Sequence, residues 1–198
     1  MSRGDEALFV DADRMRLCQV MSNLLTNAIK YSPDAARITR GRITLKRETL
    51  NLATVLDTAL EAARPLAEAR DQKLVVNRGE EDLFVEADEV RLCQVVTNLL
   101  TNAIKYSPDS GRIDVWLQST PQLATLCVLD EGVGIDPQML PRVFDMYQQG
   151  DHSLDRPQGG LGVGLTVVKH LVEMHGGTVR VENRPEGGAC FTLTLPRG

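Results

Sequence analysis

The sequence has no long hydrophobic run and few aromatic side chains, which make up 4% of its 198 residues. Nowhere do about 18 apolar residues follow one another, the length that a membrane-spanning helix needs. Residues 1–14 contain no apolar core of the kind found in signal peptides. We therefore expect no membrane segment, no export and a cytoplasmic location. The 42% of apolar residues suffices for the core of one ordinary domain, with some length left over.

Basic residues are too few for a nucleic-acid surface. The chain has 22 Lys and Arg against 27 Asp and Glu, a formal net charge of −5, whereas phosphate backbones are bound by clustered basic side chains. We expect no nucleic-acid partner.

The cysteines lack metal-ligand spacing, and each lies in an apolar stretch, which predicts small buried side chains in a reducing compartment. They are Cys18, Cys93, Cys127 and Cys190.

One segment of the sequence occurs twice. Residues 3–38 align with residues 78–113 at an offset of 75, and 27 of the 36 aligned positions are identical. Only the second copy is followed by the remaining motifs, and docking the first copy in its place would leave a large insertion. We expect residues 1–38 to be a partial duplicate that could self-associate through its apolar helix face, and residues 39–198 to form the complete domain.

Hydrophobic periodicity predicts alternating strands and helices after residue 39. We expect helices over 52–69, from Asp88 as N-cap to about Ser107-Pro108, and from Gly162 to the C-cap glycines Gly176-Gly177. The segment at about 137–161 is rich in Gly, Pro, Gln and Asp and is expected to act as a lid. The fold class is then α/β: a two-layer α/β sandwich whose mixed, mostly antiparallel sheet carries helices on one face. Strands are expected at 43–48, 74–76, 83–85, 113–117, 125–129, 179–182 and 190–195.

The helix over residues 91–107 carries an unusual polar stripe. A rotation of about 100° per residue places Asn98, Asn102 and Lys105 on one side and apolar residues on the other. Asparagine is a weak helix former, so two of them four residues apart suggest a task. Amide oxygens can ligate Mg²⁺, and Lys105 can neutralise phosphate. The alternative is a polar stripe satisfied by neighbouring loops.

Two glycine-containing segments follow in the chain. Asp130 comes at the end of an apolar strand, with Gly132 and Gly134 just beyond it. A buried carboxylate there can accept a hydrogen bond from the exocyclic amine of adenine, although a simple turn capped by Asp136 explains the same residues. Residues 159–164 then place a glycine run before a helix, and the free backbone N–H groups of such a helix start bind phosphate.

These segments, with the lid between them, resemble the asparagine, first glycine, phenylalanine and second glycine boxes of histidine-kinase catalytic domains, particularly those of hybrid sensors. The resemblance covers roughly residues 40–198 and implies a Bergerat fold that binds ATP and Mg²⁺. It implies that Asn102 ligates Mg²⁺, that Asp130 binds the adenine amine, and that Phe144 with Tyr147 forms the phenylalanine box. It implies catalytic roles for Asn98, Asn102 and Lys105. The implied nucleotide-binding residues are Asn98, Asn102, Lys105, Tyr106, Asp130, Gly132, Gly134, Ile135, Phe144, Gly160, Leu161, Gly162, Val163, Gly164 and Leu165.

The resemblance also bears on the reaction. Related ATPases carry Glu where Asn98 stands, and a neutral amide cannot take a proton from water, so phosphoryl transfer is favoured over hydrolysis. None of His152, His170 and His175 lies in the phosphoacceptor pattern of the family. The implied partners are a histidine-containing dimerisation domain, acting in trans, and a downstream response regulator. The alternatives are an inert nucleotide-binding fragment and a regulatory serine kinase of the same superfamily.

Overall fold

The computed structural model describes residues 44–79, 82–145 and 163–198. The first copy of the repeat and most of the expected lid therefore lie outside the described residues. Within the described ones, no helix is both long and apolar enough to cross a membrane. The elements are β1 (Glu48–Asn51), α3 (Leu52–Glu68), β2 (Lys73–Arg78), β3 (Phe84–Ala87), α4 (Glu89–Tyr106), β4 (Arg112–Ser119), β5 (Leu123–Leu129), the 3-10 turn η1 (Leu140–Arg142), α5 (Val163–Met174), β6 (Thr178–Asn183) and β7 (Ala189–Pro196).

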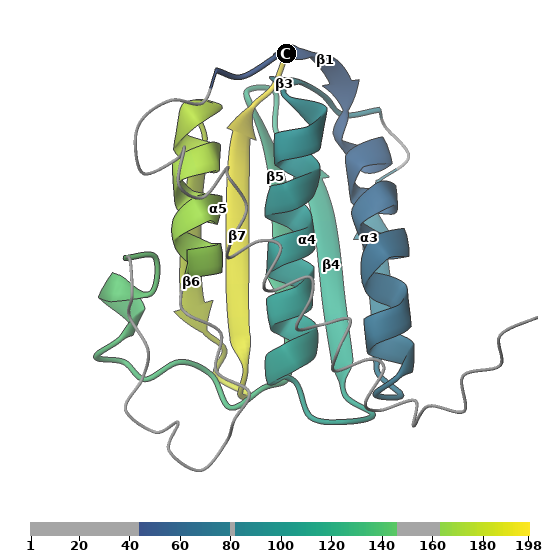
Figure 1. Cartoon of the computed structure of the whole chain (residues 1–198), viewed down its shortest axis with the longest axis vertical. Coiled ribbons are helices and arrows are strands. Elements are labelled where there is room, and N and C mark those ends of the chain that lie inside the picture. The colour runs from purple at the N-terminus through teal and green to yellow at the C-terminus, as the bar shows by residue number, and fades with distance from the viewer. Residues whose placement is uncertain (1–43, 80–81, 146–162) are drawn as a thin grey trace, which may run out of the picture.

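The described residues form two layers. Five strands in the order β2-β4-β5-β7-β6 make one sheet, in which β2 pairs with β4 in parallel and the other neighbours are antiparallel. Helices α3, α4 and α5 lie side by side over one face of this sheet (Figure 1). The expected two-layer α/β sandwich with a mixed, mostly antiparallel sheet is confirmed. A separate antiparallel pair, β1 and β3, was not predicted as a second sheet.

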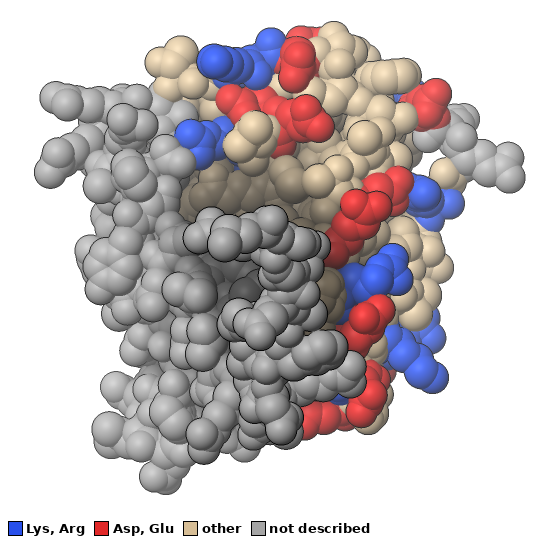
Figure 2. Space-filling view, turned by 45° about the vertical axis from the view of Figure 1, so that its right-hand side comes forward, with Lys and Arg blue, Asp and Glu red and all other residues tan. Residues whose placement is uncertain are grey.

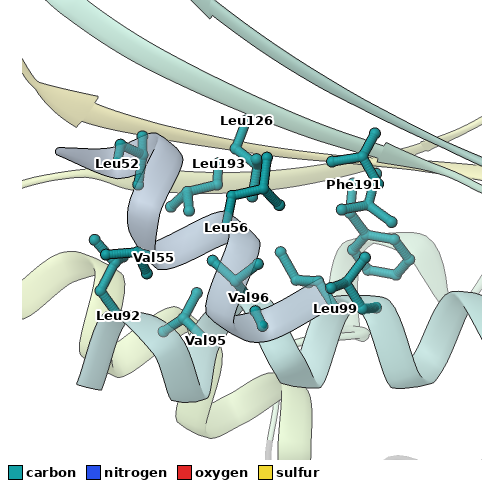
Figure 3. Close-up of a cluster of buried hydrophobic side chains, with 14 of the residues drawn as sticks. Leu52, Val55, Leu56, Leu92, Val95, Val96, Leu99, Leu126, Phe191 and Leu193 are labelled. Atoms are coloured by element: carbon teal, nitrogen blue, oxygen red, sulfur yellow. The ribbon is translucent and has the colours of Figure 1, made fainter. Parts of the chain in front are cut away.

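The core fills the space between the two layers. Helices α3 and α4 point leucine and valine side chains at the sheet, where Leu126, Phe191 and Leu193 meet them (Figure 3). Strands β5 and β7 alternate buried and half-buried residues, as expected for strands with one covered face. Burying each such leucine or valine contributes roughly 1.5–3 kcal/mol. This apolar contact fixes which side of α4 faces away from the sheet.

The ends of α4 are capped by identifiable groups. Asp88 accepts a hydrogen bond from the Arg91 backbone N–H at 3.1 Å, as its N-cap position predicts. At the other end, Gln72 donates to the carbonyl oxygens of Ile104 and Pro108 at 3.0 and 2.9 Å. Arg70 also donates to several of these last carbonyl groups, and its positive charge favours the negative end of the helix dipole.

The predicted boundaries hold for the helices but not for the first strand. The position predicted for the first strand, residues 43–48, is wrong, because β1 begins at Glu48 and ends at Asn51. Its partner β3 ends at Ala87, where Asp88 begins the cap of α4, so the ladder stops there. Lys46 instead donates its backbone N–H to the Asp88 carboxylate at 2.9 Å. The strand expected at 83–85 is likewise shifted, to 84–87.

Charged residues are interspersed on the described surface. Arg78 pairs with Asp57 at 2.9 Å and Arg70 with Asp109 at 2.8 Å. Figure 2 shows acidic and basic side chains side by side on the face in view. Exposed pairs of this kind contribute only about 0–1 kcal/mol each, so the apolar core carries the stability of the sandwich.

His175 connects the end of α5 to the start of α4. Its Nε2 accepts the Asp88 backbone N–H at 3.0 Å, and its Nδ1 lies 2.7 Å from the Leu171 carbonyl oxygen. This pattern requires the neutral ring with the proton on Nδ1. Burial, which is the largest cause, lowers the pKa of His175, and the side chain is only 3% exposed.

We expect the folded state to lose stability as pH falls below about 6.5, the ordinary histidine pKa. Below this pH the imidazole of His175 binds a proton in the unfolded chain but stays neutral in the folded one, so acidification favours unfolding. Between pH 7.5 and 5.5 the free energy of unfolding should fall by up to about 1.4 kcal/mol. Urea unfolding at both pH values measures this, and a His175→Gln variant should lack that part of the loss. An equal pH dependence in both proteins would contradict the assignment.

Candidate functional site

Asp130 lies at the end of β5 with its carboxylate buried. The side chain is 4% exposed, and Oδ1 accepts the backbone N–H groups of Gly132 at 2.8 Å and Ala189 at 3.2 Å. Both donors that the described residues supply use Oδ1, so Oδ2 keeps its capacity to accept from a ligand. Burial raises the pKa of Asp130, while the two N–H groups and then Arg184 act in the opposite direction.

The loop after Asp130 is held against the end of α4. A Cβ added to Gly132 would lie 2.5 Å from the Tyr106 carbonyl oxygen and 2.8 Å from Asp130 Oδ1. Only glycine allows this approach, because real Cβ atoms do not come within 3.0 Å of such neighbours. The contact brings the predicted adenine-binding loop next to the helix that carries the asparagine stripe. The two motifs follow one another along the chain, and the fold brings them together in space.

The hairpin between β6 and β7 supports the same loop from the other side. Asn183 uses both ends of its amide on Ile135: Oδ1 accepts the backbone N–H at 2.8 Å and Nδ2 donates to the carbonyl oxygen at 2.6 Å. Arg184 donates to the Asp130 carbonyl oxygen at 2.8 Å. Gly188, at φ +85°, packs so closely that a Cβ would lie 2.0 Å from that same oxygen. The sequence predicted only the strands at 179–182 and 190–195 here, and nothing in it indicated that the turn between them supports the Asp130 loop.

The asparagine stripe of α4 faces away from the sheet, as predicted. Asn98 is 5% exposed, and its Nδ2 finds no hydrogen-bond partner among the described residues. Leaving a buried amide donor unpaired costs about 1–3 kcal/mol. The site therefore has an unused N–H group where an acceptor oxygen of a ligand could bind. A Cβ added to Gly164 would lie 4.0 Å from Asn98 Oδ1, so the first turn of α5 runs beside Asn98.

Asn102, Lys105 and Tyr106 continue the stripe toward the Asp130 loop. Asn102 and Lys105 are half-buried, and Tyr106 is exposed. The Lys105 Nζ lies 5.0 Å from the centre of the Tyr106 ring, within range of a cation–π contact. No group of three or more His, Cys, Asp or Glu that could hold a metal ion occurs in the described part of the chain. A cation at this site would need amide and phosphate oxygens, which is the donor set that Mg²⁺ accepts.

Of the other residues predicted to bind the nucleotide, some pack against the core and some lie outside the described part of the chain. Ile135, Phe144 and Leu165 are half-buried against the core. Phe144 meets Phe191 edge to face, with ring centres 6.4 Å apart. Val163 opens α5, one residue after the predicted start. Gly160, Leu161 and Gly162 lie outside the described residues, as does Tyr147. Two small cavities of about 130 and 250 Å³ are lined by other residues than Asp130 and the asparagine stripe.

Comparison with known proteins identifies the same family that the sequence motifs resemble. Residues 87–198 match the family model described as histidine kinase-, DNA gyrase B-, and HSP90-like ATPase. The autoinducer 2 sensor kinase/phosphatase LuxQ of Vibrio vulnificus is 31% identical over 196 residues, which is 94% of this chain and 23% of LuxQ. The sensor protein KdpD of Escherichia coli is 34% identical over 172 residues, 87% of this chain and 19% of KdpD.

Solved structures agree in fold. The mycobacterial sensor histidine kinase MprB superposes with a TM-score of 0.67 at 32% identity, covering 76% of this chain and 97% of that chain. Full-length ShkA in complex with AMPPNP superposes with a TM-score of 0.72 over 92% of this chain and 36% of that one; at 24% identity it is evidence for the fold alone. Since the family model covers more than half of the residues, this chain belongs to the histidine kinase-, DNA gyrase B- and HSP90-like ATPases, on the branch of sensor-kinase catalytic domains.

Proposed function

We propose that residues 39–198 are the ATP-binding catalytic domain of a sensor histidine kinase, which transfers the γ-phosphate of ATP to a histidine supplied in trans. The chain spans 23% of the length of LuxQ and 19% of KdpD, so the activity of a whole sensor kinase is a proposal for this chain. The observation that carries the proposal is the close approach at Gly132, which sets the buried Asp130 carboxylate beside the asparagine helix.

In this proposal Oδ2 of the Asp130 carboxylate accepts a hydrogen bond from the exocyclic amine of adenine. Gly132 and Gly134 leave room for the ring beside the backbone. The specificity for adenine follows because a guanine base presents a carbonyl oxygen where adenine presents the amine, and two acceptors would then face each other across a buried gap. Ile135 and Tyr106 border the same loop and the end of α4.

The phosphates would lie along the stripe toward the start of α5. The unpaired Nδ2 of Asn98 supplies a donor, Lys105 supplies positive charge, and the Gly160–Leu165 segment supplies backbone N–H groups. The amide oxygen of Asn102 would ligate Mg²⁺, which neutralises charge on the phosphate oxygens when it is bound. Because Asn98 is a neutral amide, its position on the helix offers no general base for water, and transfer to a histidine nucleophile is favoured over hydrolysis.

Calorimetric titration with ATP, with and without Mg²⁺, tests this assignment. We expect binding that strengthens with Mg²⁺, and a loss of at least about tenfold in affinity, or roughly 1.4 kcal/mol, in Asn102→Ala. Gln118→Ala serves as the control, because Gln118 is an exposed amide on the opposite face of the sheet. Magnesium-independent binding, or equal affinity of both variants, would remove Asn102 as the ligand.

The acceptor is tested separately from binding. Incubation with labelled ATP and a histidine-containing dimerisation domain should produce acid-labile phosphate on that domain. Acid-stable phosphate on a partner would instead support the serine-kinase alternative. ATP binding without transfer to any supplied domain would support the inert nucleotide-binding fragment. The partners, namely the dimerisation domain and a response regulator, are part of the proposal, as is self-association through residues 1–38.

A further inference from the structure

Arg70 lies in the turn between α3 and β2 and binds the end of the helix that carries the asparagine stripe. Figure 1 shows this turn, the end of α4 and the end of β5 at the same edge of the domain. The Nη1 atom of Arg70 donates to the carbonyl oxygens of Ile104 and Lys105, the latter at 3.0 Å. Its Nη2 atom donates to the Ser107 carbonyl oxygen, also at 3.0 Å. One guanidinium group thus holds the backbone of the last turn of α4.

The neighbouring side chain of Gln72 binds the same helix end less strongly. Its Nε2 donates to the carbonyl oxygens of Ile104, Ser107 and Pro108 at 3.0, 3.3 and 2.9 Å. An amide nitrogen has only two N–H groups, so these oxygens share them. Gln72 is also neutral, whereas hydrogen bonds from a charged donor such as Arg70 are roughly twice as strong. Arg70 is therefore the stronger of the two contacts that fix the end of α4.

The Tyr106 carbonyl oxygen, in the middle of this turn, accepts a hydrogen bond from neither side chain. It faces Gly132, where an added Cβ would lie only 2.5 Å from it. The backbone N–H of Gly132 in turn donates to Asp130 Oδ1 at 2.8 Å. A chain of contacts therefore leads from Arg70 through the last turn of α4 to the carboxylate of Asp130.

We propose that Arg70 is a positioning residue for the adenine site, because it fixes the last turn of α4 against the Asp130 loop. This inference rests on the proposed function, in which Asp130 accepts the adenine amine. Without the guanidinium group, the turn keeps only the bonds from Gln72 and can move away from Gly132. A binding site has to be held within about 0.5 Å of its productive geometry, so a small displacement of the loop weakens the contact with the base.

Arg70 also forms a surface ion pair, which has to be separated from this effect. Its Nε lies 2.8 Å from Asp109 Oδ1, and the Asp109 side chain is 77% exposed. Pairs as exposed as this one contribute little to stability. Asp109→Asn removes the ion pair and leaves the bonds from Arg70 to the carbonyl groups. The backbone carbonyl of Arg70, which accepts the Ser110 N–H at 2.9 Å, is kept in every side-chain variant.

Affinities for ATP and GTP, measured by calorimetry, test the proposal. Arg70→Gln should bind ATP about tenfold more weakly, a typical effect of a residue that acts on a site through intervening contacts. Its affinity for GTP should not fall, because guanine offers Asp130 no amine at this position. The preference for ATP over GTP should therefore decrease, whereas partial unfolding would lower both affinities by the same factor. Arg70→Lys keeps the charge and should recover part of the preference.

Arg78→Gln is the matched control. It makes the same chemical change at the other end of β2, where Arg78 binds the Asp57 carboxylate at 2.9 Å. Both Arg78→Gln and Asp109→Asn should keep the preference for ATP of the unmodified protein. An unchanged preference in Arg70→Gln would overturn the proposal. An equal loss in Asp109→Asn would also overturn it, because the surface ion pair would then explain the effect.

Hydrogen exchange of the nucleotide-free protein separates this inference from the proposed function. Arg70→Gln should speed the exchange of backbone amides in residues 130–136, and Arg78→Gln should not. Unchanged exchange in a protein that binds ATP would remove the role of Arg70 and leave the proposed function standing. Faster exchange in Arg70→Gln, together with no ATP binding by the unmodified protein, would instead overturn the proposed function and the adenine role of Arg70 with it, while the coupling between Arg70 and the loop would stand.

Discussion

Asp130→Asn should weaken nucleotide binding by roughly 100-fold, while the fold stays intact. The asparagine Oδ1 can still accept the N–H groups of Gly132 and Ala189, which both bind that oxygen. The amide NH₂ then replaces Oδ2, the acceptor offered to adenine. Two donors would face each other in a buried place, at a cost of about 3 kcal/mol, or roughly 100-fold in affinity.

The stability of this variant should be equal to or greater than that of the unmodified protein at pH 7. Burial raises the pKa of Asp130, so the folded state disfavours its charged form and gains stability as pH falls through that pKa. An uncharged amide removes this cost. Calorimetry measures the loss of binding, and thermal melting measures the stability. Asp136→Asn is the control, because the exposed Asp136 carboxylate follows the same loop and accepts only the Gln138 backbone N–H within the described residues. A variant that binds ATP normally would exclude Asp130 as the adenine contact.

Affinity for ATP should also depend on pH in a defined direction. As pH falls through the raised pKa of Asp130, the carboxylate gains a proton and loses acceptor strength, so binding weakens at a higher pH than for an ordinary carboxyl group. In Asp130→Asn the remaining affinity should lack this dependence. Titrations at several pH values above 4 measure the difference.

Gly188→Ala should unfold the domain or strongly loosen the site. The backbone of Gly188 has φ +85°, which costs a non-glycine residue about 1–2 kcal/mol. The new methyl group would also lie 2.0 Å from the Asp130 carbonyl oxygen, and the strand or the loop must move to admit it. Overpacking of this kind costs typically about 1–3 kcal/mol more. Where the protein still folds, the displaced Asp130 should bind ATP more weakly.

Gly187→Ala is the matched control for this effect. Gly187 has φ +101° and so carries a similar conformational cost, but its added Cβ would lie 3.9 Å from the nearest atom, the Gly132 carbonyl oxygen. Urea unfolding should therefore show a distinctly larger loss for Gly188→Ala than for Gly187→Ala. Equal losses would mean that backbone conformation alone explains Gly188, and that the contact with Asp130 has no energetic consequence.

Local patterns in the sequence determined the elements and the order of the motifs. The apolar periodicity of residues 52–69 and the Asp88 cap predicted α3 and α4 correctly, because helix faces and N-caps depend on residues within a few positions of one another. The stripe of Asn98, Asn102 and Lys105 could be read for the same reason. Its proposed use on Mg²⁺ and phosphate came from the chemistry of these side chains and from a family resemblance, and the match of residues 87–198 to the ATPase family confirms the resemblance.

Tertiary structure alone decided what surrounds those motifs. Asn183 lies 48 positions from Ile135 in the sequence, and Gly188 lies 58 positions from Asp130. No local sequence pattern could therefore predict either contact. The same holds for Cys127 and Cys190, which sequence context placed among buried apolar residues. Strand alternation against neighbours on β4 and β7 turns both outward, beside one threonine. Which side of a strand faces the helices depends on packing between distant segments, and that packing is set by the core as a whole.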